Sequence, residues 1–224
     1  MLPGDSGFRK VAARSASVAS AMSQIALPFD WPAPEDAESY IVTASNRAAV
    51  DGIDRPGSWP VRAAILTGPR KSGRSLLGRI FAAKTGGTFI DDAEQHKEVD
   101  LFHRWNLAQE ERKPLLLVAL SPPPLWKVRL PDLASRLSAT PVFTINEPDD
   151  TLSRMLLEKL FARRGLQITP ETTAYIASRI ERSYVALMRI VDAIDTVALS
   201  QHRAVTTRLA RAVLEEQHLM DETD

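Results

Sequence analysis

Short apolar runs alternate with amphipathic segments between residues 38 and 148. The apolar runs predict strands at 63–67, 88–91, 114–120 and 141–145. Apolar residues at helical spacing predict helices at 38–53, 75–84, 96–111 and 131–137. Because strands that alternate with helices form a parallel sheet covered by those helices, this part of the chain is predicted to be an α/β domain.

Beyond Pro148 the strand pattern stops and only helices are predicted. Asp149 or Asp150 caps a helix that ends at Gly165, residues 169–170 open another, and two more are expected at 182–201 and 206–217. We therefore expect four parts, which are a disordered extension at 1–22, a peptide and extended tether at 23–37, the α/β domain at 38–148 and an all-α domain at 149–224.

The composition excludes several classes of protein. The 28 Lys and Arg residues balance the 28 Asp and Glu residues, so no positive surplus indicates a nucleic-acid partner. The absence of cysteine excludes disulfides, thiolate metal sites and a cysteine nucleophile, and it fits a cytoplasmic protein. No apolar run approaches the ~18 residues of a membrane span, so no membrane association is expected. Residues 1–21 lack a secretory signal, which leaves an organellar transit peptide or an over-extended start before Met22.

A glycine-rich segment directly follows the strand at 63–67. It has the spacing Gly-x-x-x-x-Gly-Lys-Ser of a phosphate-binding loop, with Arg74 in place of the lysine. Backbone N–H groups of such a loop cradle phosphates, and its serine hydroxyl holds Mg²⁺. The residues expected to bind ADP or ATP are Gly68, Pro69, Lys71, Ser72, Gly73, Arg74 and Ser75, with Ser75 as the magnesium ligand. Arg74 fits the lysine's place poorly, which argues against ATP hydrolysis, and an ordinary glycine-rich turn is the alternative.

A sheet with a phosphate-binding loop, followed by a small helical domain, is the domain arrangement of AAA+ proteins. One further segment indicates which AAA+ family the chain resembles. The octapeptide Leu130-Pro131-Asp132-Leu133-Ala134-Ser135-Arg136-Leu137 resembles the arginine-finger box of the Hda family, the DnaA-related regulators of replication initiation. The resemblance, to the alphaproteobacterial type, runs from about Gln24 to Glu216. It implies that Arg136 is an arginine finger that stabilises charge on the γ-phosphate of ATP bound to DnaA. Taken alone, Arg136 is better explained as a surface residue that forms a salt bridge with Asp132, and the whole octapeptide reverses this preference.

The segment Gln24-Ile25-Ala26-Leu27-Pro28-Phe29 resembles the bacterial sliding-clamp-binding peptide. The resemblance implies that Gln24, Leu27, Pro28 and Phe29 contact the beta sliding clamp of DNA polymerase III. An extended peptide with a polar hook and apolar anchors docks well into a preformed groove when it lies in a flexible arm. The alternative is that this peptide folds back on its own domain.

The segment Thr88-Phe89-Ile90-Asp91-Asp92 stands where the family has its Walker B strand, which implies that Asp91 orients Mg²⁺. Asp92 replaces the glutamate of active ATPases, a second argument against hydrolysis in cis. The stretch between Ser75 and this strand is too short for the strand and helix that AAA+ proteins insert there. We therefore expect a sheet that is one strand short, and the alternative is that Walker B itself is missing.

In the helical domain, the segment 180–187 resembles the sensor-2 box and implies that Arg182 reaches the nucleotide. The alternative for Arg182 is a solvated charge on an amphipathic helix.

As a whole, the resemblance implies a clamp-tethered negative regulator that stimulates ATP hydrolysis by DnaA and is not an independent enzyme. No residues remain after the helical domain for a helix-turn-helix, so sequence-specific DNA binding is not expected. A self-sufficient AAA+ ATPase or loader and a nucleotide-free interaction adaptor are the alternatives. The resemblance is also compatible with a homo-oligomer.

Overall fold

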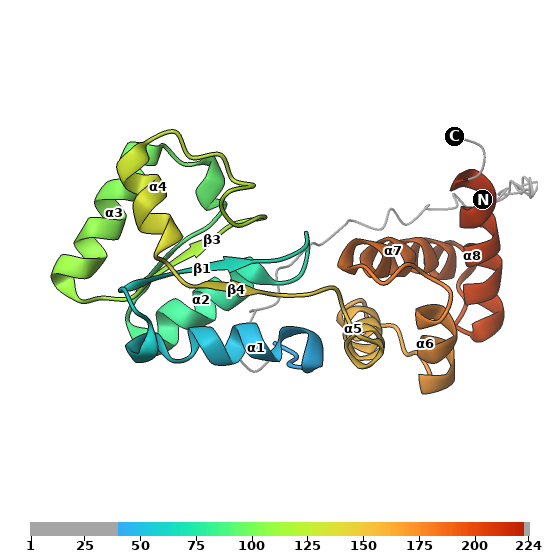
Figure 1. Cartoon of the computed structure of the whole chain (residues 1–224). Helices are drawn as coiled ribbons and strands as arrows, with labels where there is room; N and C mark the ends of the chain where they lie inside the picture. The colour runs from blue at the N-terminus through green and yellow to red at the C-terminus, as the bar shows by residue number, and fades with distance from the viewer. Residues whose placement is uncertain (1–39, 222–224) are drawn as a thin grey trace, which may run out of the picture. The chain divides into compact units, whose positions relative to one another are not determined.

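The computed structural model describes residues 40–221 (Figure 1). The clamp-peptide residues Gln24, Leu27, Pro28 and Phe29 therefore lie outside the described residues. The elements of residues 40–221 belong to one compact unit of the chain. Within this range no helix is both long enough and apolar enough to cross a membrane.

Helices and strands alternate in the first part of this range, and helices alone follow (Figure 1). The first part contains α1 (Ala44–Ile53), β1 (Ala63–Thr67), α2 (Arg74–Thr85), β2 (Thr88–Ile90), α3 (Glu98–Glu111), β3 (Leu115–Val118), α4 (Pro131–Ser138) and β4 (Val142–Thr144). The second part contains α5 (Asp150–Arg163), α6 (Pro170–Ala177), α7 (Tyr184–Gln201) and α8 (Thr207–Asp221). Short 3₁₀ turns lie at η2 (Pro56–Ser58) and η3 (Ala93–Gln95).

All four strands of the described sheet are parallel, in the order β2-β3-β1-β4. Every residue of β1 is buried, because α1 and α2 cover one face of the sheet while α3 and α4 cover the other (Figure 1). Alternate β1 side chains accordingly enter two different cores, Ala64 and Leu66 on the first face and Ala63 and Ile65 on the second. The predicted α/β class with a short parallel sheet is confirmed.

The start of α1 differs from the prediction. Residues 40–43 are not helical, and Thr43 is an extended N-cap with φ −133°. The Thr43 N–H donates to Asn46 Oδ1 at 2.8 Å, while Asn46 Nδ2 donates to the Ile41 carbonyl at 2.8 Å. The amide of Asn46 therefore satisfies backbone groups in front of the helix, which fixes its first turn at Ala44 and not near residue 38.

The helical part has its own apolar core, formed by buried residues of α5, α6, α7 and α8 such as Phe161, Ile176, Ile194 and Val213. Asp149 caps α5 by accepting the Leu152 N–H at 2.7 Å. Two other helices begin later than predicted: α3 begins at Glu98, after η3, and α7 begins at Tyr184, after Ser183 as its N-cap.

Candidate functional site

The loop between β1 and α2 has the backbone of a phosphate-binding loop. Three of its residues have positive φ angles, which are 155° at Gly68, 66° at Lys71 and 85° at Gly73. A Cβ on Gly68 would lie 2.9 Å from the Ile145 carbonyl oxygen, so this position requires glycine. Gly73 is the N-cap of α2, whose first-turn N–H groups therefore open at the end of the loop. The strand, loop and helix follow one another as predicted.

A cavity of about 390 Å³ lies beside this loop. It is lined by Tyr40, Ile41 and Asn46 before and within α1, by residues 71–76 and Arg79 of the loop and α2, by Leu152, Leu156, Lys159, Leu160 and Arg163 of α5, and by Tyr184 and Met188 of α7. We call this cavity the loop cleft. Its volume lies within the range of small-ligand and cofactor sites. Gly68 and Pro69 do not line it, whereas the other residues predicted for the loop do.

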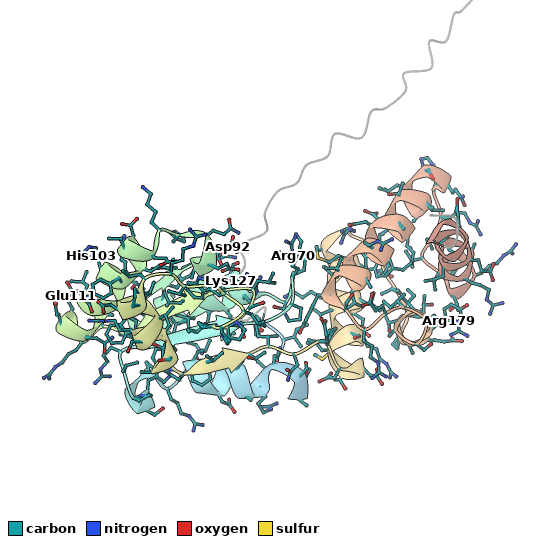
Figure 2. All side chains as sticks on the ribbon, turned by 45° about the horizontal axis from the view of Figure 1, so that its top comes forward. Arg70, Asp92, His103, Glu111, Lys127 and Arg179 are labelled. Atoms are coloured by element: carbon teal, nitrogen blue, oxygen red, sulfur yellow. The ribbon has the colours of Figure 1, made fainter. Side chains whose placement is uncertain are left out.

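Three polar atoms of residues that line the loop cleft are buried and have no hydrogen-bond partner within residues 40–221: Tyr40 Oη, Ser72 Oγ and Arg74 Nη1. Buried polar groups are nearly always paired, because an unpaired group loses its hydration without compensation. A guanidinium, two hydroxyls and a helix N-terminus together suit an anion such as a phosphate. The residues present therefore fit the phosphate groups of a nucleotide. Arg70, by contrast, is exposed (Figure 2).

Two tyrosines close the loop cleft beside the phosphate loop. Burial raises the pKa of Tyr40 to about 12, and the amide of Asn46 offsets part of this effect. Burial, and then the proximity of Tyr40, also raises the pKa of Tyr184, whose hydroxyl donates to the Asn146 carbonyl at 3.1 Å. Both side chains are therefore neutral at pH 7 and add no negative charge to the cleft.

The helical part contributes different cations from the one expected. Arg182 forms an ion pair with Asp150 at 2.9 Å, with both side chains more than half exposed, and it does not line the loop cleft. Lys159 and Arg163 of α5 line it instead. Their spacing of four residues places them on one helix face with Leu152 and Leu156, and this pattern was the signal available in the sequence.

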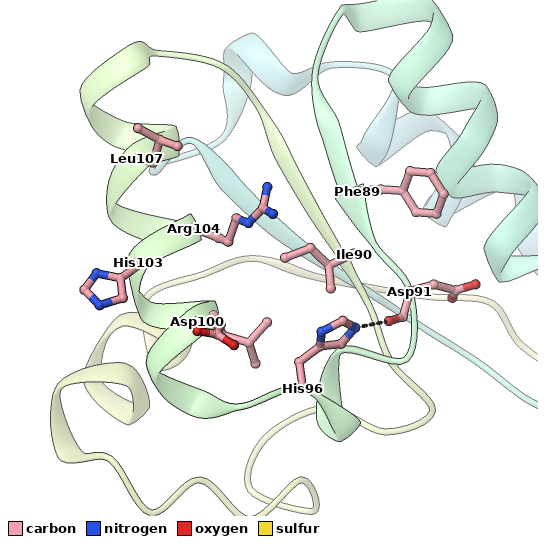
Figure 3. Close-up of a pocket in the computed structure, with 9 residues that line it drawn as sticks. Phe89, Ile90, Asp91, His96, Asp100, His103, Arg104 and Leu107 are labelled. Atoms are coloured by element: carbon pink, nitrogen blue, oxygen red, sulfur yellow. Dashed lines mark hydrogen bonds between the residues drawn. The ribbon is translucent and has the colours of Figure 1, made fainter.

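Asp91 lies in a second pocket, of about 620 Å³, between β2 and α3 (Figure 3). That pocket is lined by Phe89, Ile90, Asp91, His96, Asp100, Leu101, His103, Arg104 and Leu107. The Asp91 carboxylate accepts the Asp92 N–H at 3.2 Å. The backbone carbonyl oxygen of Asp91 lies 3.1 Å from His96 Nε2. Ser75 lines the loop cleft and Asp91 lines this second pocket, and their joint role as magnesium ligands stays a prediction. The described residues also contain no cluster of three His, Cys, Asp or Glu side chains suited to a metal.

Arg136 lies in the last turn of α4, where its guanidinium packs on α3. Its Cζ is 4.4 Å from the ring centroid of Phe102 and 5.4 Å from that of Trp105. Nε donates to Asn106 Oδ1 at 2.9 Å, and Nη1 donates to the Asp132 carbonyl at 3.2 Å. Sequence reasoning missed this contact, because Asn106 is thirty residues away in the chain. The contact to Asp132 uses its backbone, so the alternative of an Arg136–Asp132 ion pair is not what the structure shows.

The segment that leads into α4 is held by Glu98. Its carboxylate accepts the N–H groups of Arg129 at 2.9 Å and Leu130 at 2.6 Å. These backbone donors lower the pKa of the Glu98 carboxyl. Glu94 of η3 similarly accepts the Leu120 N–H at 2.8 Å, so two glutamates on either side of the η3–α3 junction hold both ends of the 120–130 loop.

Comparisons with known proteins agree with this geometry. Residues 150–214 match the family model described as the Hda lid domain. The fold is similar to domain III of the replication initiation protein DnaA from Thermotoga maritima, with a TM-score of 0.64 and 15% identity over 80% of this chain and 95% of that one. It is also similar to the RuvB Holliday junction branch migration motor of Thermotoga maritima, with a TM-score of 0.57 and 15% identity over 81% of this chain and 72% of that one.

A curated relative, an uncharacterized protein of Haemophilus influenzae, is 28% identical over 118 residues. The aligned region covers 52% of this chain and 51% of the relative, so the chain spans about half the length of that protein.

Proposed function

We propose that this chain is a DnaA-related negative regulator of replication initiation that holds ADP and acts on DnaA, because residues 150–214 match the Hda lid domain and the fold is similar to domain III of DnaA. The observation that carries the nucleotide part of the proposal is the buried, unpaired Nη1 of Arg74 beside the loop cleft. A buried guanidinium N–H without a partner destabilises the protein unless an anion occupies the cleft.

Each part of the loop cleft has a role in this proposal. Backbone N–H groups at the start of α2 bind the phosphates, and Arg74 donates to them from the side. Lys71 lines the same cleft as a second cation, while Asn46 and Tyr40 line it beside the phosphate loop. When bound, a nucleoside diphosphate supplies the negative charge that pairs with Arg74. Ser75, which lines the cleft, and Asp91, which follows β2, are the proposed ligands of a magnesium ion bound with the nucleotide.

Action on DnaA is assigned to Arg136. An arginine at the end of a short helix can stabilise the charge that develops on the γ-phosphate of a neighbouring subunit, so the chemistry takes place in the site of DnaA. The resemblance of residues 130–137 to the finger box and the Hda lid support this role. Residues 24–29 are proposed to bind the beta sliding clamp, which would place the protein on DNA in the cytoplasm.

The alternative of a self-sufficient ATPase is less well supported. Arg74 replaces the phosphate-loop lysine, Asp92 replaces the glutamate of active ATPases and Arg182 pairs with Asp150. The nucleotide-free adaptor is also disfavoured, because it leaves three buried polar atoms of the loop cleft without partners.

The test is the rate at which DnaA loses bound ATP in the presence of clamp loaded on DNA. We expect the protein to accelerate this loss, and we expect replacement of Leu27 and Phe29 by Ala to abolish the effect and clamp binding without changing thermal stability. Equal rates with and without the protein would contradict the proposed action on DnaA. Robust ATP hydrolysis by the protein alone would instead favour the ATPase.

A further inference from the structure

The guanidinium of Arg136 is fixed before any partner arrives. Its face packs on Phe102, its Nε–H is bonded to Asn106 and one Nη1 N–H is bonded to the Asp132 carbonyl. Phe102 and Asn106 are four residues apart and therefore lie on one face of α3.

The support under Arg136 is itself held in place. Trp105 Nε1 donates to Thr140 Oγ1 at 3.1 Å, and Thr140 Oγ1 donates to the Arg136 carbonyl at 2.8 Å. The ring of Trp105 is thus tied to the last turn of the helix that carries Arg136. This arrangement restricts both the helix end and the side chain to one position.

The hydrogen bonds leave one edge of the guanidinium available. An arginine has five N–H donors, of which one on Nε and one on Nη1 are used here. Three donors remain, two of them on Nη2. Arg136 is partly exposed, and Nη2 has no hydrogen bond within the described residues, which leaves its donors for a partner.

We propose that Asn106, together with the ring of Phe102, is a positioning residue that fixes the rotamer of Arg136 and turns its Nη2 edge toward the phosphate of the partner's nucleotide. This inference rests on the proposed function, because it assigns how the finger is oriented. A finger that is already ordered loses little conformational entropy when it meets the phosphate, and its donors need no reorganisation.

The acceptor of the Arg136 Nε–H, Asn106 Oδ1, is an uncharged amide oxygen. An amide oxygen at Asn106 orients the Nε–H without opposing the positive charge. A carboxylate at the same place would hold the guanidinium more strongly, but it would offset the charge that must act on the phosphate. Positioning by a neutral group and simple structural support therefore predict different results for Asn106→Asp.

The experiment measures DnaA ATP loss on DNA-loaded clamp over a range of concentrations of the full chain. For Asn106→Ala we expect the maximal rate to fall roughly tenfold or more, since small misplacement of a catalytic group costs up to about 100-fold, while the half-maximal concentration stays nearly constant. For Asn106→Asp we expect a similar fall in maximal rate with unchanged or higher thermal stability.

Gln109→Ala is the matched control. Gln109 lies on the same helix, where its Oε1 accepts the Arg62 N–H at 2.8 Å and its Nε2 donates to the Trp105 carbonyl at 3.3 Å. It makes no described contact with Arg136. The Gln109→Ala variant should lower thermal stability about as much as Asn106→Ala and should still stimulate ATP loss from DnaA fully.

Full stimulation by Asn106→Ala, or an equal loss in Gln109→Ala, would overturn the positioning role while leaving the regulator function intact. Full stimulation by Asn106→Asp would overturn the requirement for a neutral acceptor. A parent protein that does not stimulate DnaA at all would overturn the proposed function and this inference with it.

Discussion

Two arginines of the α/β part, Arg74 and Arg136, are held in opposite ways. Arg74 has a buried Nη1 without a hydrogen-bond partner within the described residues. Arg136 has its Nε and Nη1 paired and its face packed on an aromatic ring. The difference indicates that the Arg74 side chain suits an anion bound in the loop cleft, whereas the Arg136 side chain is ordered by contacts within its own domain.

Replacement of Gly68, in the loop that carries Arg74, should have the largest effect on stability and on ADP binding. Gly68→Ala places a Cβ 2.9 Å from the Ile145 carbonyl at a φ of 155°, so we expect the free energy of unfolding to fall by about 3 kcal/mol and ADP binding to be lost. Urea unfolding and calorimetric titration with ADP measure both. Gly86→Ala is the control, because φ there is 66° but nothing lies within 4 Å, and it should cost only about 1 kcal/mol. Equal losses would show that the loop needs no close approach.

Arg74→Ala tests the unpaired side of the comparison. We expect ADP to bind roughly 10- to 100-fold more weakly, because charge-assisted hydrogen bonds contribute about 1.5–3 kcal/mol. The thermal stability of the nucleotide-free protein should stay the same or rise, since an unpaired buried N–H has been removed. Unchanged ADP affinity would show that the Arg74 side chain does not face the phosphates.

Arg136→Ala tests the paired side through stability. Loss of the aromatic contact and of two hydrogen bonds should lower the free energy of unfolding by about 1–2 kcal/mol. Arg129→Ala is the comparison, because the Arg129 side chain is exposed and its bond to Glu98 uses the backbone N–H. We expect no measurable change there. A destabilised Arg129→Ala beside an unaffected Arg136→Ala would reverse our description of the two sites.

Tyr40→Phe should have the smallest effect, visible only at alkaline pH. Tyr40 ionises near pH 10 in the unfolded chain and near 12 in the folded protein. Between these values the folded state binds more protons, so stability falls as the pH rises from about 10 to 12. Urea unfolding at pH 9 and 11 should show a smaller loss for Tyr40→Phe than for the parent. Equal losses would place the Tyr40 hydroxyl in solvent.

The sequence predicted features that depend on local spacing. The phosphate loop from Gly68 to Ser75, the strand before it and the helix after it follow from residues that are neighbours in the chain. The short parallel sheet follows from the small number of residues between Ser75 and Thr88, which leaves no room for a further strand and helix. Local hydrogen bonding already limits this success: the amide of Asn46 moves the start of α1 to Ala44, which apolar spacing alone does not reveal.

Features that depend on packing between distant segments could not be predicted. Arg182 precedes the N-cap of α7 and meets Asp150 of α5, and the cations that the helical part contributes to the loop cleft come from α5 instead. The partner of Arg136 is Asn106, on another helix. Asp91 directly follows β2 as expected, and its backbone carbonyl faces His96 in the pocket beside α3 while its carboxylate points away from His96 (Figure 3).

The most direct test compares the parent protein with Arg136→Ala in the loss of ATP from DnaA on DNA-loaded clamp. Arginine fingers contribute about 10³- to 10⁵-fold in rate in GTPases, so we predict that Arg136→Ala reduces the rate almost to that of DnaA without the protein. Circular dichroism, ADP content and clamp binding should show that the variant remains folded and bound. A folded Arg136→Ala protein that stimulates DnaA as well as the parent would contradict the account, because Arg136 would then serve only to pack α4 on α3.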